Sequence, residues 1–127
     1  MKLLDTSFLI DLQREFHGKR PGRATAFLQA NAEVVFKISV ISVTEFLEGF
    51  PKVDDGEALL AGYARLEVTS RVARQAAILR RRLRQEGRLI GDFDILIAAT
   101  ALAKELPLVT NNPDRFRRFP GLSLVPY

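Results

Sequence analysis

The chain has 127 residues, and 47% of them are hydrophobic, which suffices for one domain with its own core and excludes an intrinsically disordered protein. It has no cysteine, which excludes disulfide bonds, thiol catalysis and zinc–thiolate sites and suits a cytoplasmic protein. The formal net charge of +4 fits a polyanionic partner, and the apolar runs are too short for a membrane span or a signal peptide.

Strands and helices are predicted to alternate along the chain. The predicted strands are the aliphatic and β-branched stretches at residues 2–5, 34–41, 65–69, 108–110 and 122–125. The predicted helices lie at residues 22–31, from about residue 42, at 71–88 and at 92–105, with a break at 51–57 and a turn at 111–116. This alternation predicts one α/β domain over residues 1–127, in which helices cover both faces of a small parallel sheet.

Polar residues at the carboxyl ends of parallel strands are candidates for a site, because ligands bind there in sheets of this kind. Asp5 closes the first predicted strand, Glu45 lies just past the second, and Thr110 and Asn112 come at the end of the fourth. Both acids also have a purely structural explanation. Asp5 is a favourable N-cap for a helix that follows it, and Glu45 has the S-x-x-E spacing of a capping box with Ser42.

Two carboxylates stand at the start of the predicted helix 92–105. Asp92 follows Gly91 and is expected to cap the helix, whereas Asp94 falls in its first turn. Residues 95–99 are apolar, so the helix is expected to be buried, where a carboxylate without a cation is unfavourable. We therefore expect an arginine, a lysine or a metal ion to face Asp94. The alternative is that both acids simply favour the first turn of a helix.

Asp5, Glu45 and Asp94 would repel one another if they met in one cleft, unless a cation lay between them. With oxygen ligands and no cysteine, the ions that suit such a cluster are Mg²⁺ and Mn²⁺. One ion, or two ions about 4 Å apart, would clamp phosphate oxygens and activate water for hydrolysis.

The predicted helix 71–88 carries an apolar stripe and a group of arginines. Arg81, Arg84 and Arg88 either hold a phosphate backbone or form the solvated face opposite the stripe. His17 is the only histidine and is expected at the surface. No phosphate-binding loop and no nucleophile elbow occurs in the sequence.

Four motifs, in this order and spacing, resemble those of the PIN-domain ribonucleases, above all the VapC-type toxins of prokaryotic toxin–antitoxin pairs: LLDTSFLIDL, SVTEFLEG, IGDFDILIAATALA and LVTNNPDRF. The resemblance covers residues 3 to about 125. It implies a three-layer α/β/α fold and an endoribonuclease that depends on Mg²⁺ or Mn²⁺. It assigns the first family acid to Asp5, the second to Glu45 and the third to Asp94, and places Asp92 where the family varies.

The same resemblance assigns Thr110 and Asn112 to the polar strand-end motif that completes the site. The sequence departs from the family pattern at two places. The family often has an acid directly before the phenylalanine, where this chain has Arg115, with Asp114 one place earlier; Ser7 stands where asparagine is common. The resemblance also implies a homodimer and a VapB-type antitoxin partner.

Two other functions stay open. The first is a catalytically weak or inactive PIN-like module that binds RNA or a protein, which the missing fourth acid would favour. The second is a phosphatase with Asp5 as nucleophile, as in haloacid-dehalogenase-like proteins. Such enzymes usually have a second acid two residues later, where this chain has Ser7.

Overall fold

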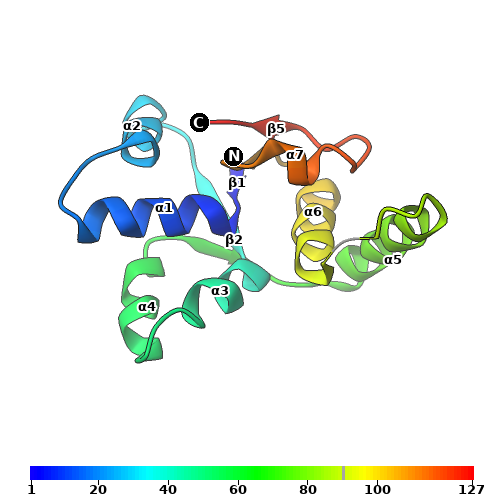
Figure 1. Ribbon diagram of the computed structural model, residues 1–127, viewed down its shortest axis with the longest axis horizontal. Helices are drawn as coiled ribbons and strands as arrows, with labels where there is room; N and C mark the ends of the chain where they lie inside the picture. Colours follow the sequence, from blue (N-terminus) through cyan, green and yellow to red (C-terminus); the bar gives the residue numbers. More distant parts are fainter. Residues whose placement is uncertain (90) are drawn as a thin grey trace.

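A five-stranded parallel sheet runs through the centre of the computed structural model, which describes residues 1–89 and 91–127 (Figure 1). The strands lie in the order β3-β2-β1-β4-β5. They are β1 (Lys2–Leu4), β2 (Phe36–Ser39), β3 (Ala64–Leu66), β4 (Leu108–Val109) and β5 (Leu124–Val125). Each overlaps one predicted strand, so the predicted α/β class with a small parallel sheet is confirmed. Ile90, the first residue of the third motif, lies outside the described residues.

Helices cover both faces of this sheet. Within the described ranges they are α1 (Thr6–His17), α2 (Arg23–Ala30), α3 (Val40–Leu47), α4 (Val53–Leu60), α5 (Ser70–Gln85), α6 (Asp92–Lys104) and α7 (Pro113–Phe116). Figure 1 shows α1, α2 and α4 on one side of the strands and α5 and α6 on the other. In the part of the chain that the structure describes, no helix has the length and apolarity needed to cross a lipid bilayer.

The two central strands divide the core into two layers. Leu3 and Leu108 belong to the apolar cluster that contains α5, α6 and α7, whereas Leu4 and Val109 belong to the cluster formed with α1 to α4. Adjacent residues of a strand point to opposite faces, so each strand contributes to both clusters. The result is a three-layer α/β/α arrangement in which both faces of β1 and β4 are buried.

The pairing of α5 with α6 follows the sequence pattern closely. The predicted stripe of Val72, Ala76, Leu79 and Leu83 is buried against α6. Helix α6 is buried on most of its surface, as its apolar composition predicts. The opening turn of α6 is consequently placed next to the carboxyl ends of the strands.

Several local predictions were wrong. The predicted turn at 111–116 contains the short helix α7. The strand predicted at 34–41 ends at Ser39, whose Oγ accepts a hydrogen bond from the Ile41 N–H at 3.0 Å and caps α3. Ser42 is therefore buried within α3 and forms no capping box with Glu45. The N-cap of α6 is Gly91, and Asp92 is the first helical residue.

The predicted break at 51–57 is also wrong, because α4 begins at Val53. Asp54 and Asp55 in its first turn favour a helix start through the helix dipole. Gly56 then allows close packing, since an added Cβ would lie 2.7 Å from Leu47 Cδ2. A glycine that looks like a turn signal in the sequence thus serves the contact between α3 and α4.

Candidate active site

Asp5 lies at the junction of β1 and α1 and is almost fully buried. Its Oδ1 accepts hydrogen bonds from the Phe8 N–H at 3.0 Å and from Ser7 Oγ at 2.6 Å. The capping role predicted for Asp5 is thereby confirmed. It does not exclude the second role, because the carboxylate also stands at the carboxyl end of a central strand, where the sheet places ligands.

The surroundings of Asp5 favour its protonated form. Burial raises the pKa of Asp5, and hydrogen bonds from Ser7 and Thr110, together with the charge of Arg115, only partly oppose this effect. Thr110 is buried at the end of β4, and its Oγ1 accepts a hydrogen bond from the Asn112 N–H at 3.0 Å. A cation beside Asp5 would relieve the cost of keeping its carboxylate charged.

Glu45 is held by a residue of the neighbouring α1. Thr6 Oγ1 lies 2.7 Å from Glu45 Oε1, to which it donates, and 3.1 Å from Ser42 Oγ. The pKa of the half-buried Glu45 is raised by burial, lowered by the Thr6 hydroxyl and raised again by the charge of Asp94. Glu45 and Asp94 are therefore close enough to repel each other.

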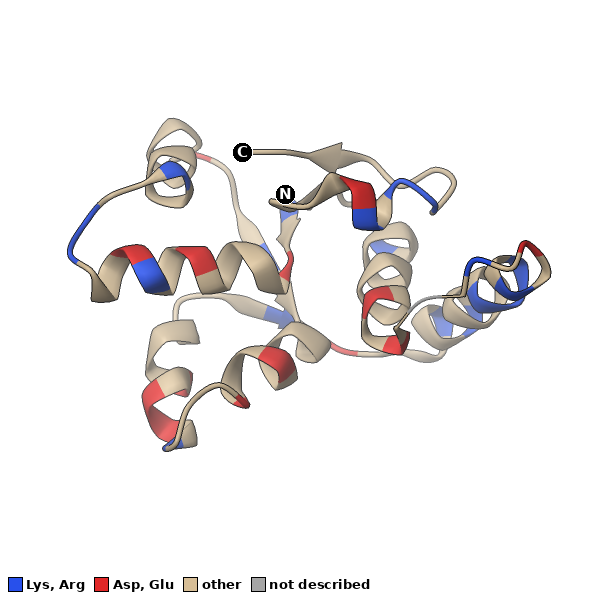
Figure 2. Ribbon diagram, viewed as in Figure 1, with Lys and Arg blue, Asp and Glu red and all other residues tan. Residues whose placement is uncertain are grey.

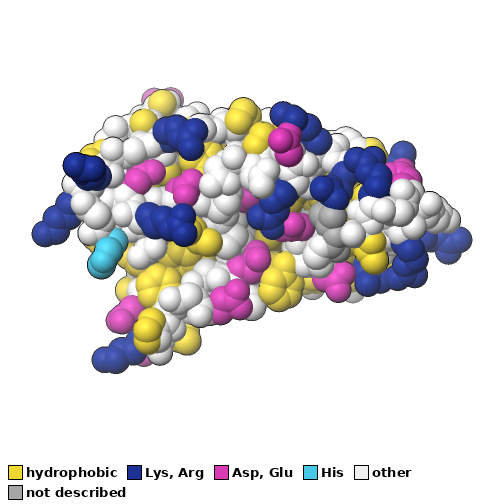
Figure 3. All heavy atoms as spheres, in the orientation of Figure 1, with side chains coloured by type: hydrophobic (Ala, Val, Ile, Leu, Met, Phe, Trp, Pro, Cys, Tyr) yellow, Lys and Arg dark blue, Asp and Glu magenta, His cyan; other side chains and the backbone are white. Residues whose placement is uncertain are grey.

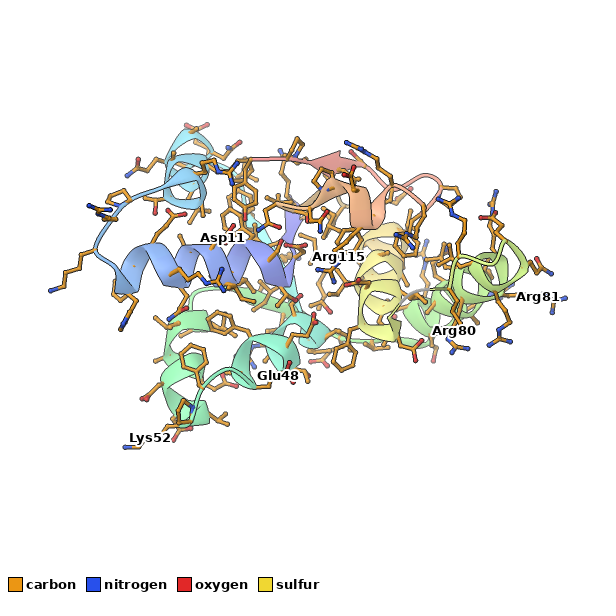
Figure 4. All side chains as sticks on the ribbon, in the orientation of Figure 1. Asp11, Glu48, Lys52, Arg80, Arg81 and Arg115 are labelled. Carbon is orange, nitrogen blue, oxygen red and sulfur yellow. The ribbon has the colours of Figure 1, made fainter. Side chains whose placement is uncertain are left out.

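Asp94 faces the cation that its burial predicts, and that cation is Arg115. Arg115 Nε donates to Asp94 Oδ2 at 3.1 Å, and a terminal guanidinium nitrogen donates to Asp94 Oδ1. The hydrogen bond to Asp94 raises the pKa of Arg115, as do the charges of Asp94, Asp5 and Glu45. Figure 4 shows Arg115 pointing from α7 into the space between α1 and α6. One guanidinium thus lies among all three predicted acids.

A hollow of about 360 Å³ opens beside this cluster. It is lined by Glu45, Gly91, Asp92, Phe93, Asp94 and Arg115. In the space-filling view, acidic and basic side chains adjoin one another near the middle of this face (Figure 3). Phe93 is 42% exposed and presents an aromatic ring at the rim. The hollow therefore offers three carboxylates, one guanidinium and a stacking surface to a ligand.

The donor set fits a hydrated Mg²⁺ or Mn²⁺ ion. Among the described residues, no three histidine, cysteine, aspartate or glutamate side chains form a metal cage by themselves. Mg²⁺ does not require one, because it usually keeps several waters and binds through one or two carboxylates. Glu45 and Asp94 supply such a pair of oxygen ligands on one hollow, with Asp5 close enough to act on the same guanidinium.

Two other acids that were candidates for the site, Asp92 and Asp114, each pair with an arginine other than Arg115. Asp92 accepts a hydrogen bond from Arg80 Nε at 2.9 Å, at the edge of the hollow. Asp114 is 76% exposed and pairs with Arg117 rather than with the cluster. Asp114 therefore does not supply a carboxylate to the hollow in place of the missing family acid.

The arginines predicted to position RNA lie on or just beyond α5. Arg81, Arg84 and Arg88 are exposed, and Nη1 of Arg88 lies 3.6 Å from Oε2 of Glu86. Figure 2 shows α5 as the most densely basic helix, and Figure 4 places Arg81 at its outer part, well away from Arg115. His17 ends α1 and is exposed, as predicted.

Sequence reasoning missed two residues of this site. Thr6 follows the first acid directly, and nothing in the sequence indicates that its hydroxyl would meet Glu45. The sequence marks Arg115 only as a departure from the family pattern, although the burial of Asp94 predicts a cation. Asn112 caps α7 without a side-chain hydrogen bond.

Comparison with known proteins agrees with the fold and the motifs. The family model of the PIN domain matches residues 2–122. The chain is 34% identical to Ribonuclease VapC19 of Mycobacterium tuberculosis over 126 residues, which cover 96% of this chain and 97% of that protein. It is 30% identical to Ribonuclease VapC1 of Methanocaldococcus jannaschii over 128 residues, which cover 98% of this chain and 85% of that protein.

A solved structure extends the similarity to three dimensions. A chain in the crystal structure of VapBC2 from Rickettsia felis, bound to a DNA fragment from their promoter, superposes with a TM-score of 0.83 at 27% identity. The match covers 99% of this chain and 98% of that chain. The chain therefore belongs to the PIN-domain family, and within it to the VapC ribonucleases of toxin–antitoxin systems.

Proposed function

We propose that the protein is a Mg²⁺-dependent endoribonuclease, the toxin component of a type II toxin–antitoxin system that acts on RNA in the cytoplasm. Mn²⁺ would serve in place of Mg²⁺. Family membership supports the reaction class. The observation that carries the proposal is the gathering of Asp5, Glu45 and Asp94 around the guanidinium of Arg115, because it supplies oxygen ligands for a hard cation in one place.

In this proposal Glu45 and Asp94 bind the ion and Asp5 completes the site from the end of β1. When bound, Mg²⁺ would act as a Lewis acid that stabilises charge on a phosphate oxygen and lowers the pKa of water. The protein supplies preorganisation. Ser7 and the Phe8 N–H hold the Asp5 carboxylate, and Thr6 holds Glu45, so neither acid has to be ordered when the ion arrives.

We further propose that exposed arginines position the RNA backbone. Arg81, Arg84 and Arg88 contribute positive charge on and beside α5. Contacts of this kind neutralise phosphates without reading bases, so the affinity for RNA should fall as the salt concentration rises. Phe93 at the rim of the hollow is placed to stack on an unpaired base.

A VapB-type antitoxin and a second copy of the chain are the proposed protein partners. The similar Rickettsia felis chain was solved as part of VapBC2 with promoter DNA. In this chain, a groove of about 610 Å³ between α1 and α4 is lined largely by apolar side chains, among them Leu9, Phe16, Phe46, Leu59 and Tyr63. Phe16 is 74% exposed there. Covering it with an apolar segment of an antitoxin would remove that surface from water.

A second function is favoured by one specific observation. Arg115 neutralises Asp94 and stands where the family often has an acid. If this ion pair is permanent, the domain would bind RNA or a protein without cleaving it. The phosphatase alternative has no comparable support, since Ser7 is a hydrogen-bond partner of Asp5 rather than a second acid.

Incubation with a mixed RNA pool distinguishes the two functions. The samples are the wild-type chain with Mg²⁺, the same chain with EDTA, and Asp94→Asn with Mg²⁺. The matched control is Asp114→Asn, which removes an exposed acid outside the hollow. We expect cleavage by the wild type and the control only. Cleavage that persists with EDTA and in Asp94→Asn would contradict the metal mechanism, and RNA binding without any cleavage would support the binding-only function.

A further inference from the structure

Arg115 engages the same oxygens of Asp94 that a metal ion would need. Its Nε and a terminal guanidinium nitrogen each donate to a different oxygen of the carboxylate. This two-pronged arrangement is the strong form of an arginine–carboxylate pair. The pair also lines the hollow in which the ion is proposed to bind. The guanidinium and the ion therefore compete for one set of lone pairs.

We propose that Arg115 is an internal counter-cation of the metal site, and that a divalent ion binds only when the Arg115 side chain leaves Asp94. This inference rests on the proposed function, since it assumes that Asp94 is a metal ligand. It adds a role for a residue that replaces an acid, and it predicts weaker metal binding than the carboxylates alone would give.

The two partners differ in their freedom to move. The Asp94 side chain is only 12% exposed and belongs to α6, which is buried on most of its surface. The Arg115 side chain is 45% exposed and belongs to the four-residue helix α7. Its neighbour Phe116 is buried and anchors the backbone of α7. Because arginine has a long flexible stem, the guanidinium can leave while α7 stays in place.

The charges around Arg115 favour its pairing with Asp94. Asp94, Asp5 and Glu45 all act on this one guanidinium. Without a cation, three carboxylates near one hollow would repel one another. Arg115 partly balances them, and its positive charge would in turn repel an incoming divalent ion. The pair with Arg115 therefore opposes metal binding at Asp94.

Metal binding can be measured without any RNA substrate. We would titrate Mn²⁺ into the full chain at low ionic strength and follow binding by calorimetry and by the electron paramagnetic resonance signal of free Mn²⁺. The test variant is Arg115→Gln. The matched control is Arg117→Gln, which removes the same charge from an exposed residue that pairs with Asp114 outside the hollow.

We expect Arg115→Gln to bind Mn²⁺ about tenfold more tightly than the wild type, the change in affinity that corresponds to losing one partly exposed charge-assisted pair. Arg117→Gln should stay within about twofold, since surface pairs contribute little. Arg115→Lys keeps the charge but loses the two-pronged contact. Its affinity should lie between those of the wild type and Arg115→Gln, and it serves as the second variant if Arg115→Gln folds poorly.

Titration of Asp94→Asn separates failure of this inference from failure of the proposed function. If Asp94→Asn loses Mn²⁺ binding while Arg115→Gln binds no more tightly than the wild type, the inference is wrong and the metal site remains. If none of the variants binds Mn²⁺, the metal site and the inference are both wrong. An equal gain of Mn²⁺ affinity in Arg115→Gln and Arg117→Gln would show that only the net charge of the protein matters, and it would also overturn the inference.

Discussion

Replacing Asp5 by asparagine should stabilise the protein and abolish its activity. The side chain is 2% exposed, and burial raises its pKa above the ordinary value of 3.8 in spite of the hydrogen bonds from Ser7 and Thr110. Because the folded chain holds the proton more tightly than the unfolded chain, stability is lost as the pH rises through the pKa of the folded state. At neutral pH the wild type therefore carries an unfavourable buried charge that asparagine removes.

The size of the gain follows from the contacts of Asp5. Asparagine keeps an oxygen for the Phe8 N–H and is as good an N-cap as aspartate. Asparagine carries no charge, so it removes the cost of keeping a buried carboxylate ionised. The lost attraction between the charge and the start of α1 offsets about 0.3–1 kcal/mol. We expect a net gain in the free energy of unfolding at neutral pH and a higher Tm, because the cost of the buried charge exceeds this loss.

The assay is chemical denaturation of the metal-free protein between pH 4 and pH 8. The difference between Asp5→Asn and the wild type should be largest at neutral pH and should shrink as the pH falls toward 3.8. Asp114→Asn is the control, because this exposed acid should change stability by less than about 0.5 kcal/mol. An Asp5→Asn variant that is less stable than the wild type at neutral pH, or a stability difference that does not change with pH, would show that the buried charge of Asp5 is not unfavourable.

Three further variants test other contacts. Thr6→Val removes the donor that lowers the pKa of Glu45, so the acidic limb of the pH–rate profile should move to higher pH, whereas Thr6→Ser should leave it unchanged. Glu15→Gln should lower the free energy of unfolding in urea denaturation, with a larger loss above pH 4.5 than below it. Burial opposes ionisation of Glu15, but backbone N–H donors of Gly22, Ala24 and Thr25 outweigh burial and lower its pKa. Leu83→Ala should lower the free energy of unfolding by about 2–5 kcal/mol, because Leu83 of α5 is 2% exposed and belongs to the core. An unchanged unfolding midpoint in Glu15→Gln or in Leu83→Ala would show that the contacts of that residue do not stabilise the fold.

Much of the fold could be predicted because its signals are local. Strands β4 and β5 lie in short apolar stretches, and α6 and the stripe of α5 show their burial directly in composition and spacing. The boundary between β2 and α3 could not be predicted in this way. The β-branched run continues past Ser39 into a helix, since the cap at Ser39 and packing against α1 and α6 outweigh intrinsic strand propensity there.

The site was predictable in part for the same reason. Asp5 and Asp94 are conspicuous, because each is an acid beside an apolar segment. The burial of Asp94 even predicts a cation on physical grounds alone. Its identity as Arg115 depends on how α7 packs against α6, a contact between residues 21 positions apart that no local pattern encodes. The hydrogen bond from Thr6 to Glu45 likewise depends on the packing of α1 against α3.

The position of a bound ion shows whether Asp94 is a metal ligand. Crystals grown with Mn²⁺ can be measured at a wavelength at which manganese scatters anomalously, which locates the ion without assumptions about its ligands. We predict an anomalous peak within about 2–2.3 Å of an oxygen of Asp94, in the hollow that Glu45 also lines, with the Arg115 guanidinium moved away from Asp94. If crystals saturated with Mn²⁺ show no peak in the hollow, and Arg115 still pairs with Asp94, this prediction is wrong.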